Sequence, residues 1–185
     1  MVTKYAIPYL IVSASKGRNP SVLNLSPPLS MQTRWFAPHT AYSMSKYGMS
    51  MCVLGMSGEF AEKGIAFNAL WPKHVTFFFF YFHLNNNFQA VATAAIEWIA
   101  GSDSLNQCRK AEVMADAAFI VLTRDSNKVT GNFYIDEVVL EESGMSKKEI
   151  HHKYSVDPSS EMIRDFFVED KIFENEPNSK SMPKF

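Results

Sequence analysis

The sequence predicts an α/β protein built on an incomplete, doubly wound parallel β-sheet. Three short apolar runs rich in strand-forming residues, at 21–26, 65–71 and 131–136, alternate with segments of helical composition. Strands that alternate with helices in this way are typical of a parallel sheet. A doubly wound sheet has both faces covered and usually contains five or more strands, so these three strands correspond to part of such a fold.

The first elements are predicted to be a helix end and a buried strand. Residues 5–15 are apolar and end at Gly17, which interrupts the helical pattern. Residues 21–26 form a short β-prone run that Pro27 closes, and residues 30–40 are expected to form a loop.

A long helix is predicted over residues 40–63, with Thr40 as its N-cap and Gly64 as its C-cap. The helix contains many small side chains and three glycines, which lower its intrinsic helix propensity. Such a helix is stable only when packing supports it. Its small residues permit close approach by another helix or by a ligand, which makes residues 40–63 the candidate surface for a homo-oligomer contact.

The following elements are a second strand, two helices and a third strand. Residues 65–71 end at Pro72, and residues 131–136 begin at a glycine turn. Helices are expected over 90–100 and 106–123. The second of these helices has an apolar face formed by Val113, Ala117, Ile120 and Val121, with Arg109, Lys110 and Glu112 lying away from it. We expect residues 1–142 to form one domain, followed by a polar, weakly ordered extension over 143–185.

The bulk composition excludes several classes of function. The 185 residues carry a net charge of −1, which gives no electrostatic reason for a nucleic-acid partner. Cys52 and Cys108 match no metal or redox spacing, and no metal site is expected. The chain shows no secretory signal, and the apolar run at 75–84 is half the length of a membrane-spanning helix, so no transmembrane segment is predicted.

Tyr42 and Lys46 are the strongest candidates for acid/base chemistry. Their spacing places both side chains on one face of a helix, one turn apart. A free tyrosine has a pKa near 10, and a neighbouring ammonium favours the phenolate and lowers that pKa toward the neutral range. A phenol tuned in this way exchanges a proton with a substrate carbonyl or alcohol. The Tyr-x-x-x-Lys spacing by itself is common on helices, so the surrounding sequence decides whether the pair is interpreted as catalytic.

That context resembles the short-chain dehydrogenase/reductase family. The matching pattern is a strand ending in Asn24-Leu25-Ser26, then Tyr42-x-x-x-Lys46 at the start of a helix, then a strand ending in Asn68-Ala69-Leu70-Trp71-Pro72. Further strings, among them Thr130-Gly131-Asn132-Phe133, match a narrower subgroup of the family. The resemblance runs from about residue 6 to residue 142 and implies the second half of a Rossmann-like fold.

The resemblance implies an oxidoreductase that interconverts an alcohol and a carbonyl with NADP or NAD as cofactor. Tyr42 matches the acid/base, Lys46 the residue that tunes Tyr42 and binds the nicotinamide ribose, and Ser26 the residue that orients the substrate oxygen. Ser30 is a second candidate for that last role, because the spacing to Tyr42 departs from the usual pattern of the family. Pro72 matches the turn that faces the cofactor. The family further implies a small-molecule substrate, including lipid-derived ones, and a peroxisomal or mitochondrial location, for which no targeting signal is seen.

The sequence also departs from the family in ways that support an alternative. No Gly-x-Gly-x-x-Gly turn and no other phosphate-binding loop occurs in the sequence. The alternative is a catalytically inactive fragment or isoform that lacks the cofactor-binding half, arising from an incomplete or mis-spliced gene model. In that case the chain alone does not bind the cofactor.

The aromatic run at 75–89 is predicted to be an anomalous insertion. If these fifteen residues are removed, the family pattern continues and Thr93 takes the place of the threonine that contacts the nicotinamide carboxamide, a role for which Thr76 is the other candidate. The T- and A-rich codons of Phe, Tyr, Leu and Asn, and ends compatible with splice sites, indicate an intron read in frame. A lid or a patch for a hydrophobic ligand is the alternative, and in either case Phe77–Phe82 has the composition of an aggregation-prone segment.

Overall fold

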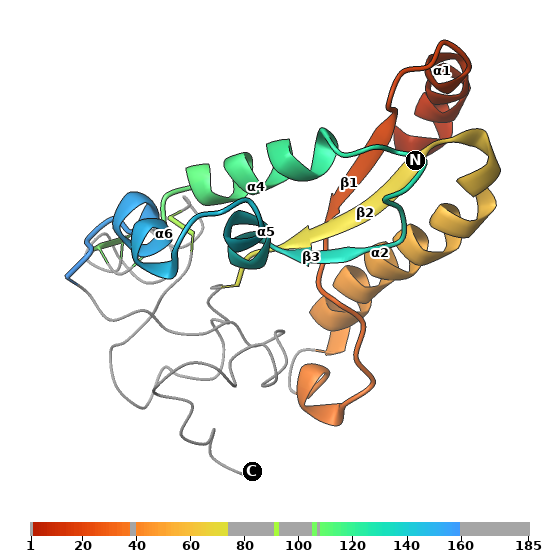
Figure 1. Ribbon diagram of the computed structural model, residues 1–185. Coiled ribbons are helices and arrows are strands. Elements are labelled where there is room, and N and C mark those ends of the chain that lie inside the picture. Colours follow the sequence, from red (N-terminus) through yellow and green to blue (C-terminus); the bar gives the residue numbers. More distant parts are fainter. Residues whose placement is uncertain (1, 38–39, 74–90, 93–104, 107, 160–185) are drawn as a thin grey trace.

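The computed structural model describes residues 2–37, 40–73, 91–92, 105–106 and 108–159. Its centre is a parallel sheet of three strands in the order β1-β2-β3, formed by Ser21–Leu25, Ala66–Trp71 and Phe133–Ile135 (Figure 1). Helices α1 (Val2–Ser15) and α2 (Thr40–Glu59) precede and follow β1, and α4 (Glu112–Leu122) precedes β3. The predicted α/β class and the parallel sheet are confirmed, and the arrangement is that of a partial Rossmann-like fold.

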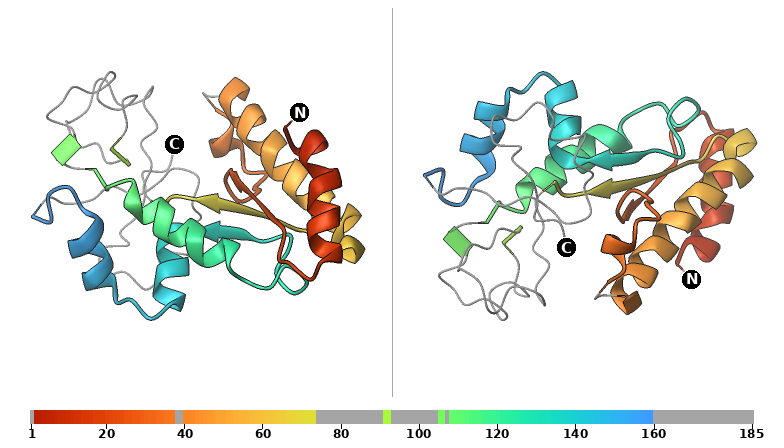
Figure 2. Two further views of the ribbon diagram at one scale, coloured as in Figure 1. Left: turned by 90° about the horizontal axis from the view of Figure 1, so that it is seen from above. Right: turned by 90° about the horizontal axis from the view of Figure 1, so that it is seen from below.

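The alternation of side chains along β2 assembles a core on each face of the sheet. All six residues of β2 are buried. Phe67 and Ala69 pack in a cluster with Val53 of α2, whereas Leu70 packs in a second cluster with Val113 of α4. Because successive strand residues point to opposite faces, one strand supports both layers. Figure 2 shows α1 and α2 together on one side of the strands and α4 on the other.

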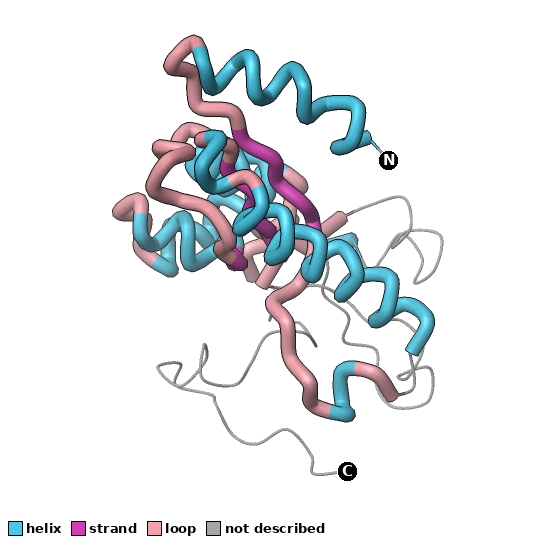
Figure 3. The backbone as a smooth tube through the Cα atoms, turned by 90° about the vertical axis from the view of Figure 1, so that its right-hand side faces the viewer, coloured by secondary structure: helices cyan, strands magenta, loops and turns pink. Residues whose placement is uncertain are grey.

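Helix α2 contacts the loop that follows β1 through two of its buried serines. Its buried residues are Ser43, Tyr47, Ser50, Val53 and Ser57. Ser50 donates a hydrogen bond to the carbonyl of Pro27 at 2.6 Å, and Ser43 donates one to the carbonyl of Trp35. Figure 3 shows the loop that receives these bonds, leaving β1 and passing through the short helical turn η1 (Thr33–Trp35) before α2. The small buried side chains therefore bring α2 close to this loop.

The end of α2 follows the prediction with one refinement. The α-helix ends at Glu59, and the chain continues as a 3₁₀ turn, η2, over Ala61–Lys63. Gly64 then adopts a left-handed conformation with φ of 68°, as expected of a C-cap glycine. A Cβ added at Gly64 would lie 2.9 Å from Oδ1 of Asn127, so the Asn127 side chain would have to shift.

Helix α4 is shorter than predicted, and this moves one residue from the surface to the interior. The helix begins at Glu112 rather than at 106, while Val113, Ala117 and Val121 are buried as expected. Arg109 precedes the helix and is buried, with its backbone in bridges to Val91 and Ser155. The prediction that Arg109 lies on the polar face of a helix is therefore wrong.

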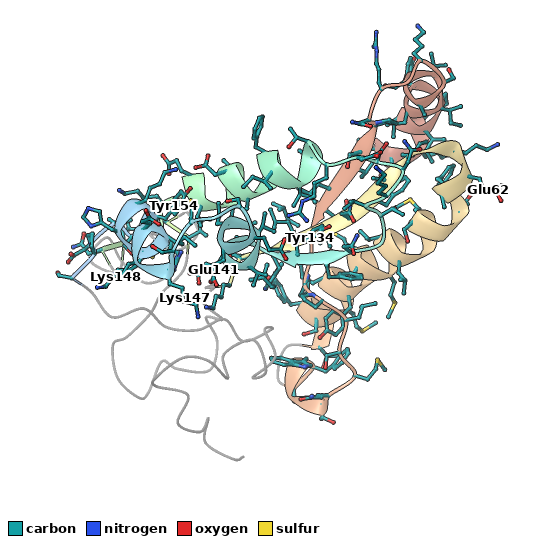
Figure 4. All side chains as sticks on the ribbon, viewed as in Figure 1. Glu62, Tyr134, Glu141, Lys147, Lys148 and Tyr154 are labelled. Atoms are coloured by element: carbon teal, nitrogen blue, oxygen red, sulfur yellow. The ribbon has the colours of Figure 1, made fainter. Side chains whose placement is uncertain are left out.

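The described part of the C-terminal region differs from the weakly ordered extension that we expected over 143–185. Helix α5 (Asp136–Glu142) follows β3 directly, and α6 (Lys147–Tyr154) follows α5 (Figure 4). Ile150 and Tyr154 of α6 are buried in the core cluster that contains Val113. Their i, i+4 spacing gives α6 an apolar side, although the segment is otherwise polar. The aromatic run at 75–89 and most of the expected helix at 90–100 lie outside the described residues. Val91, which is described, forms a β-bridge with Arg109.

Candidate active site

The candidate residues lie where the strands end. Ser26 directly follows β1, Pro72 directly follows β2, and Tyr42 and Lys46 occupy the first turns of α2. Because β1 and β2 are parallel, with Leu25 paired to Leu70, both carboxyl ends reach the same edge of the sheet. In open α/β sheets this edge is where ligands bind. Thr76 and Thr93, the two candidates for a carboxamide contact, lie outside the described residues.

Lys46 connects the first turns of α2 with the ends of both strands. Its ammonium lies 5.9 Å from the centroid of the Tyr42 ring and 5.2 Å from the centroid of the Trp71 ring. The same ammonium donates a hydrogen bond to the carbonyl of Leu25 at 3.3 Å. Tyr42 itself is partly exposed, at 40%. The predicted proximity of Tyr42 and Lys46 is thus present, with Lys46 held by the last residue of each strand.

Partial burial changes the electrostatics of Lys46. Removal of the ammonium from water lowers the pKa of Lys46 from its ordinary value. The ring faces of Tyr42 and Trp71 and the carbonyl of Leu25 present negative electrostatic potential to the ammonium, which partly replaces the lost hydration.

Ser26 and Ser30 differ in what their hydroxyl groups do. Ser26 is fully buried, and its Oγ has no hydrogen-bond partner within the described part of the chain. Ser30 accepts a hydrogen bond from the indole nitrogen of Trp35 at 2.8 Å. A buried hydroxyl without a partner has a desolvation cost that a ligand oxygen could remove. This difference favours Ser26 over Ser30 as the hydroxyl available to form a hydrogen bond with a ligand.

The turn after Pro72 is fixed by two acidic residues that follow β3. The backbone N–H of Lys73 donates to Oδ1 of Asp136 at 2.7 Å, and the Lys73 ammonium pairs with Glu137 at 2.9 Å. Arg109 pairs with the same carboxylate of Glu137. All four side chains are buried. Burial raises the pKa of Asp136 to about 6, although the hydrogen bond from the Lys73 N–H acts in the opposite direction.

This charged cluster was not predicted from the sequence. The available signal was the pair Asp136-Glu137 directly after a strand, at the edge where polar residues often serve a site. Within the described ranges, no group of three or more His, Cys, Asp and Glu side chains is arranged to hold a metal ion. A membrane-spanning helix is also lacking there, since none of the described helices is both long and apolar enough.

Comparison with known proteins gives clear relatives. No protein-family model matches the chain. Hydroxysteroid dehydrogenase-like protein 2 from Danio rerio is 42% identical over 169 residues, which are 91% of this chain and 35% of the relative. The protein of the same name from Xenopus laevis is 41% identical over 170 residues, with 92% and 35% covered. The chain thus spans about a third of the length of these curated relatives.

A solved structure agrees with the sequence comparison. A short chain dehydrogenase from Mycobacterium thermoresistibile is 38% identical, with a TM-score of 0.71 over 91% of this chain and 52% of that chain. The resemblance noted from the Tyr-x-x-x-Lys context therefore extends to the fold as well as to the sequence. Over the region that it shares with these proteins, the chain is similar in sequence and in fold to short-chain dehydrogenases.

Proposed function

We propose that this chain carries the acid/base half of an oxidoreductase that uses NADP or NAD to interconvert an alcohol and a carbonyl. The observation that carries the proposal is the position of Lys46, which lies beside Tyr42 and contacts the ends of β1 and β2. The contacts of Lys46 with the carboxyl ends of two parallel strands support this role, because ligands bind at this edge in open α/β sheets. The relatives named above support an oxidoreductase of the short-chain dehydrogenase/reductase type.

The proton transfer is assigned to Tyr42. In the reductive direction its hydroxyl donates a proton to the substrate oxygen, and in the oxidative direction the phenolate accepts that proton. The ammonium of Lys46 favours the phenolate form because it places a positive charge near the ring. Ser26 would donate a hydrogen bond to the substrate oxygen, where negative charge develops. The nicotinamide cofactor would supply or accept the hydride.

The residues present fit the nicotinamide end of such a cofactor. The unpartnered hydroxyl of Ser26, the ammonium of Lys46 and the half-buried Pro72 all follow or contact the carboxyl ends of the strands. Lys46 would bind the nicotinamide ribose, and Pro72 and Thr93 would contact the nicotinamide. The substrate is proposed to be a small carbonyl or alcohol, including lipid-derived ones, and the location to be the peroxisome or the mitochondrion.

A second candidate is a catalytically inactive fragment or isoform. One observation favours it: within the described part of the chain, β1 pairs only with β2, and its other edge carries no strand. An open strand edge exposes unpaired backbone groups and is prone to association. The sequence also contains no glycine-rich phosphate loop. Under this candidate the folded chain does not bind a dinucleotide.

A contact between copies of the chain is proposed through residues 40–63. Along α2, Met44 and Met51 are exposed. Gly48, Gly55 and Gly58 continue the same face at intervals of three and four residues. Apart from the adjoining residues and the backbone of α2 itself, no atom of the described residues lies within 4 Å of a Cβ added at any of these glycines. An exposed helix face that alternates methionine with glycine suits close approach by a second helix.

Substitution of Tyr42 tests the proposed function. Tyr42→Phe removes only the hydroxyl, so turnover of an alcohol or carbonyl should fall by about 100-fold or more. Dinucleotide affinity should change little, because the ring and Lys46 remain. Tyr9→Phe, at an exposed tyrosine of α1, is the matched control and should leave turnover unchanged. Equal turnover in wild type and Tyr42→Phe would refute the role of Tyr42.

A further inference from the structure

One carboxylate holds both ends of the connection between β2 and α4. Lys73, two residues after β2, pairs with Oε2 of Glu137 at 2.9 Å. Arg109, three residues before α4, pairs with Oε1 of the same side chain. The exposed fractions of the three side chains are 3% for Lys73, 3% for Arg109 and 7% for Glu137. Residues 36 positions apart in the sequence are therefore joined through Glu137.

The sheet register explains why Glu137 reaches Lys73. Trp71, the last residue of β2, is paired with Ile135, the last residue of β3. The residues that follow both strands consequently leave the sheet side by side. Asp136 strengthens this contact, since its Oδ1 accepts the N–H groups of Lys73 and Glu137, both at 2.7 Å. The turn after Pro72 is thus fixed by main-chain and side-chain bonds together.

The backbone around Arg109 is fixed as well. The carbonyl of Arg109 accepts a hydrogen bond from the N–H of Ala92 at 2.8 Å, and Arg109 forms backbone bridges with Val91 and Ser155. The N–H of Val156 donates to the carbonyl of Cys108 at 2.9 Å. The far end of the connection is therefore tied to the end of α6.

Charge balance makes Glu137 the central member of this cluster. Lys73 and Arg109 supply two cations, and Asp136 and Glu137 supply two carboxylates. Nε and Nη1 of Arg109 have no hydrogen-bond partner in the described part of the chain, whereas its Nη2 pairs with Oε1 of Glu137. Removal of one member of a buried ion pair leaves an uncompensated charge, which is far more costly than the loss of an exposed pair.

We propose that Glu137 is a positioning residue that clamps both ends of the β2–α4 connection, and through Lys73 fixes the turn after Pro72. The clamp itself stands on the contacts above, whereas its relevance to a bound nicotinamide rests on the proposed function. Because Glu137 holds Lys73 and Arg109, the segment between these two residues can change in length without displacing either of them. The clamp would therefore hold the turn in place whether or not residues 75–89 are present.

Hydrogen–deuterium exchange of the full chain tests the clamp without any ligand. Glu137→Gln keeps the shape of the side chain but removes its charge. We expect exchange to rise by about tenfold or more in peptides covering 71–73 and 108–110, while the middle of α2 is unchanged. Glu137→Asp retains the charge and should restore part of the protection. Glu142→Gln is the matched control on the same helix, because it removes the exposed pair with Arg124 and should leave both peptides as in wild type.

If Glu137→Gln does not fold, a second variant still tests the proposal. Lys73→Met leaves Arg109 paired with Glu137, so exchange should rise at 71–73 and stay unchanged at 108–110. Unchanged exchange at 71–73 in Lys73→Met, or an equal rise in Glu142→Gln, would overturn the proposal. Titration of wild type with NADPH and with NADH in the same series is independent of this result: absence of binding of both would defeat the proposed function and leave the measured clamp intact.

Discussion

The ammonium of Lys46 on α2 lies 5.2 Å from the ring centroid of Trp71, the last residue of β2. A cation at this distance is attracted to the electron-rich face of an indole, and the contact holds the Lys46 ammonium beside the carboxyl end of β2. The hydrogen bond from Lys46 to Leu25 fixes the same ammonium against β1. The residue proposed to tune Tyr42 is therefore positioned by the two strands that define the candidate site.

Ser26 is expected to separate function from stability. Its buried hydroxyl lacks a partner among the described residues, so Ser26→Ala should leave the free energy of unfolding unchanged or raise it by about 1 kcal/mol. Turnover should nevertheless fall, because the substrate oxygen loses a donor. Ser50→Ala is the matched control: it removes the 2.6 Å bond to Pro27 and should lower stability by about 1 kcal/mol. Denaturant unfolding measures both, and a clear loss of stability in Ser26→Ala would contradict this account.

Asp136 is expected to make stability depend on pH. Its pKa is raised to about 6 in the folded chain, against about 3.9 in an unfolded chain. The folded state therefore binds the proton more tightly, and the stabilisation by this group is complete below pH 4 and lost as the pH rises through 6. Asp136→Asn keeps the acceptor oxygen for Lys73 and Glu137. Between pH 4 and pH 7, the free energy of unfolding of this variant should rise relative to that of wild type by on the order of 3 kcal/mol.

A control with the opposite sign is available for Asp136. The hydrogen bond from the Asn127 N–H lowers the pKa of the exposed Asp125 below its ordinary value. The stabilisation by Asp125 is present at neutral pH and lost as the pH falls. At neutral pH Asp125→Asn should therefore have a lower free energy of unfolding than wild type, whereas Asp136→Asn should have a higher one. Unfolding curves of Asp136→Asn that run parallel to wild type across this range would show that Asp136 does not titrate as stated.

The glycine face of α2 is expected to control self-association. Gly55→Leu places a large side chain on the face proposed to receive a second helix, and the association constant should fall by about tenfold or more. Ala115→Leu makes a comparable change at an exposed position of α4 and should have no effect. Analytical ultracentrifugation measures both variants. A wild-type chain that stays monomeric at high concentration would refute a contact through residues 40–63.

Residues 75–89 are expected to be absent from the correctly spliced message. We predict that a transcript spanning the codons of Lys73 and Ala90 lacks the fifteen intervening codons. A chain shortened in the same way should be more soluble, since it loses an uncharged aromatic segment. Sequencing of the spliced transcript decides this point, and a message that retains these codons would contradict the hypothesis.

The elements that the sequence predicted best are those whose local pattern agrees with their environment. The strand at 65–71 is continuously apolar because both of its faces are covered, and Gly64 marks the turn before it through a conformation that glycine adopts readily. Tyr42 and Lys46 were recognisable because one helical turn fixes their spacing. These features depend on neighbours in the sequence.

The features that were missed depend on contacts between distant residues. Arg109 reads as a surface residue, and only its pairing with Glu137 and its bridges to Val91 and Ser155 place it inside. Helix α6 was missed because its two buried residues are surrounded by polar ones. Its capping box, in which Ser146 and Glu149 bond each other's backbone N–H groups, was the local signal that would have revealed it.

Titration of the purified, folded chain with NADPH and NADH tests the central claim most directly. Calorimetry or fluorescence should show saturable binding to at least one of them, and Tyr42→Phe should retain that affinity while losing turnover. Absence of saturable binding by the folded chain would contradict an active oxidoreductase and leave the inactive fragment or isoform as the remaining candidate.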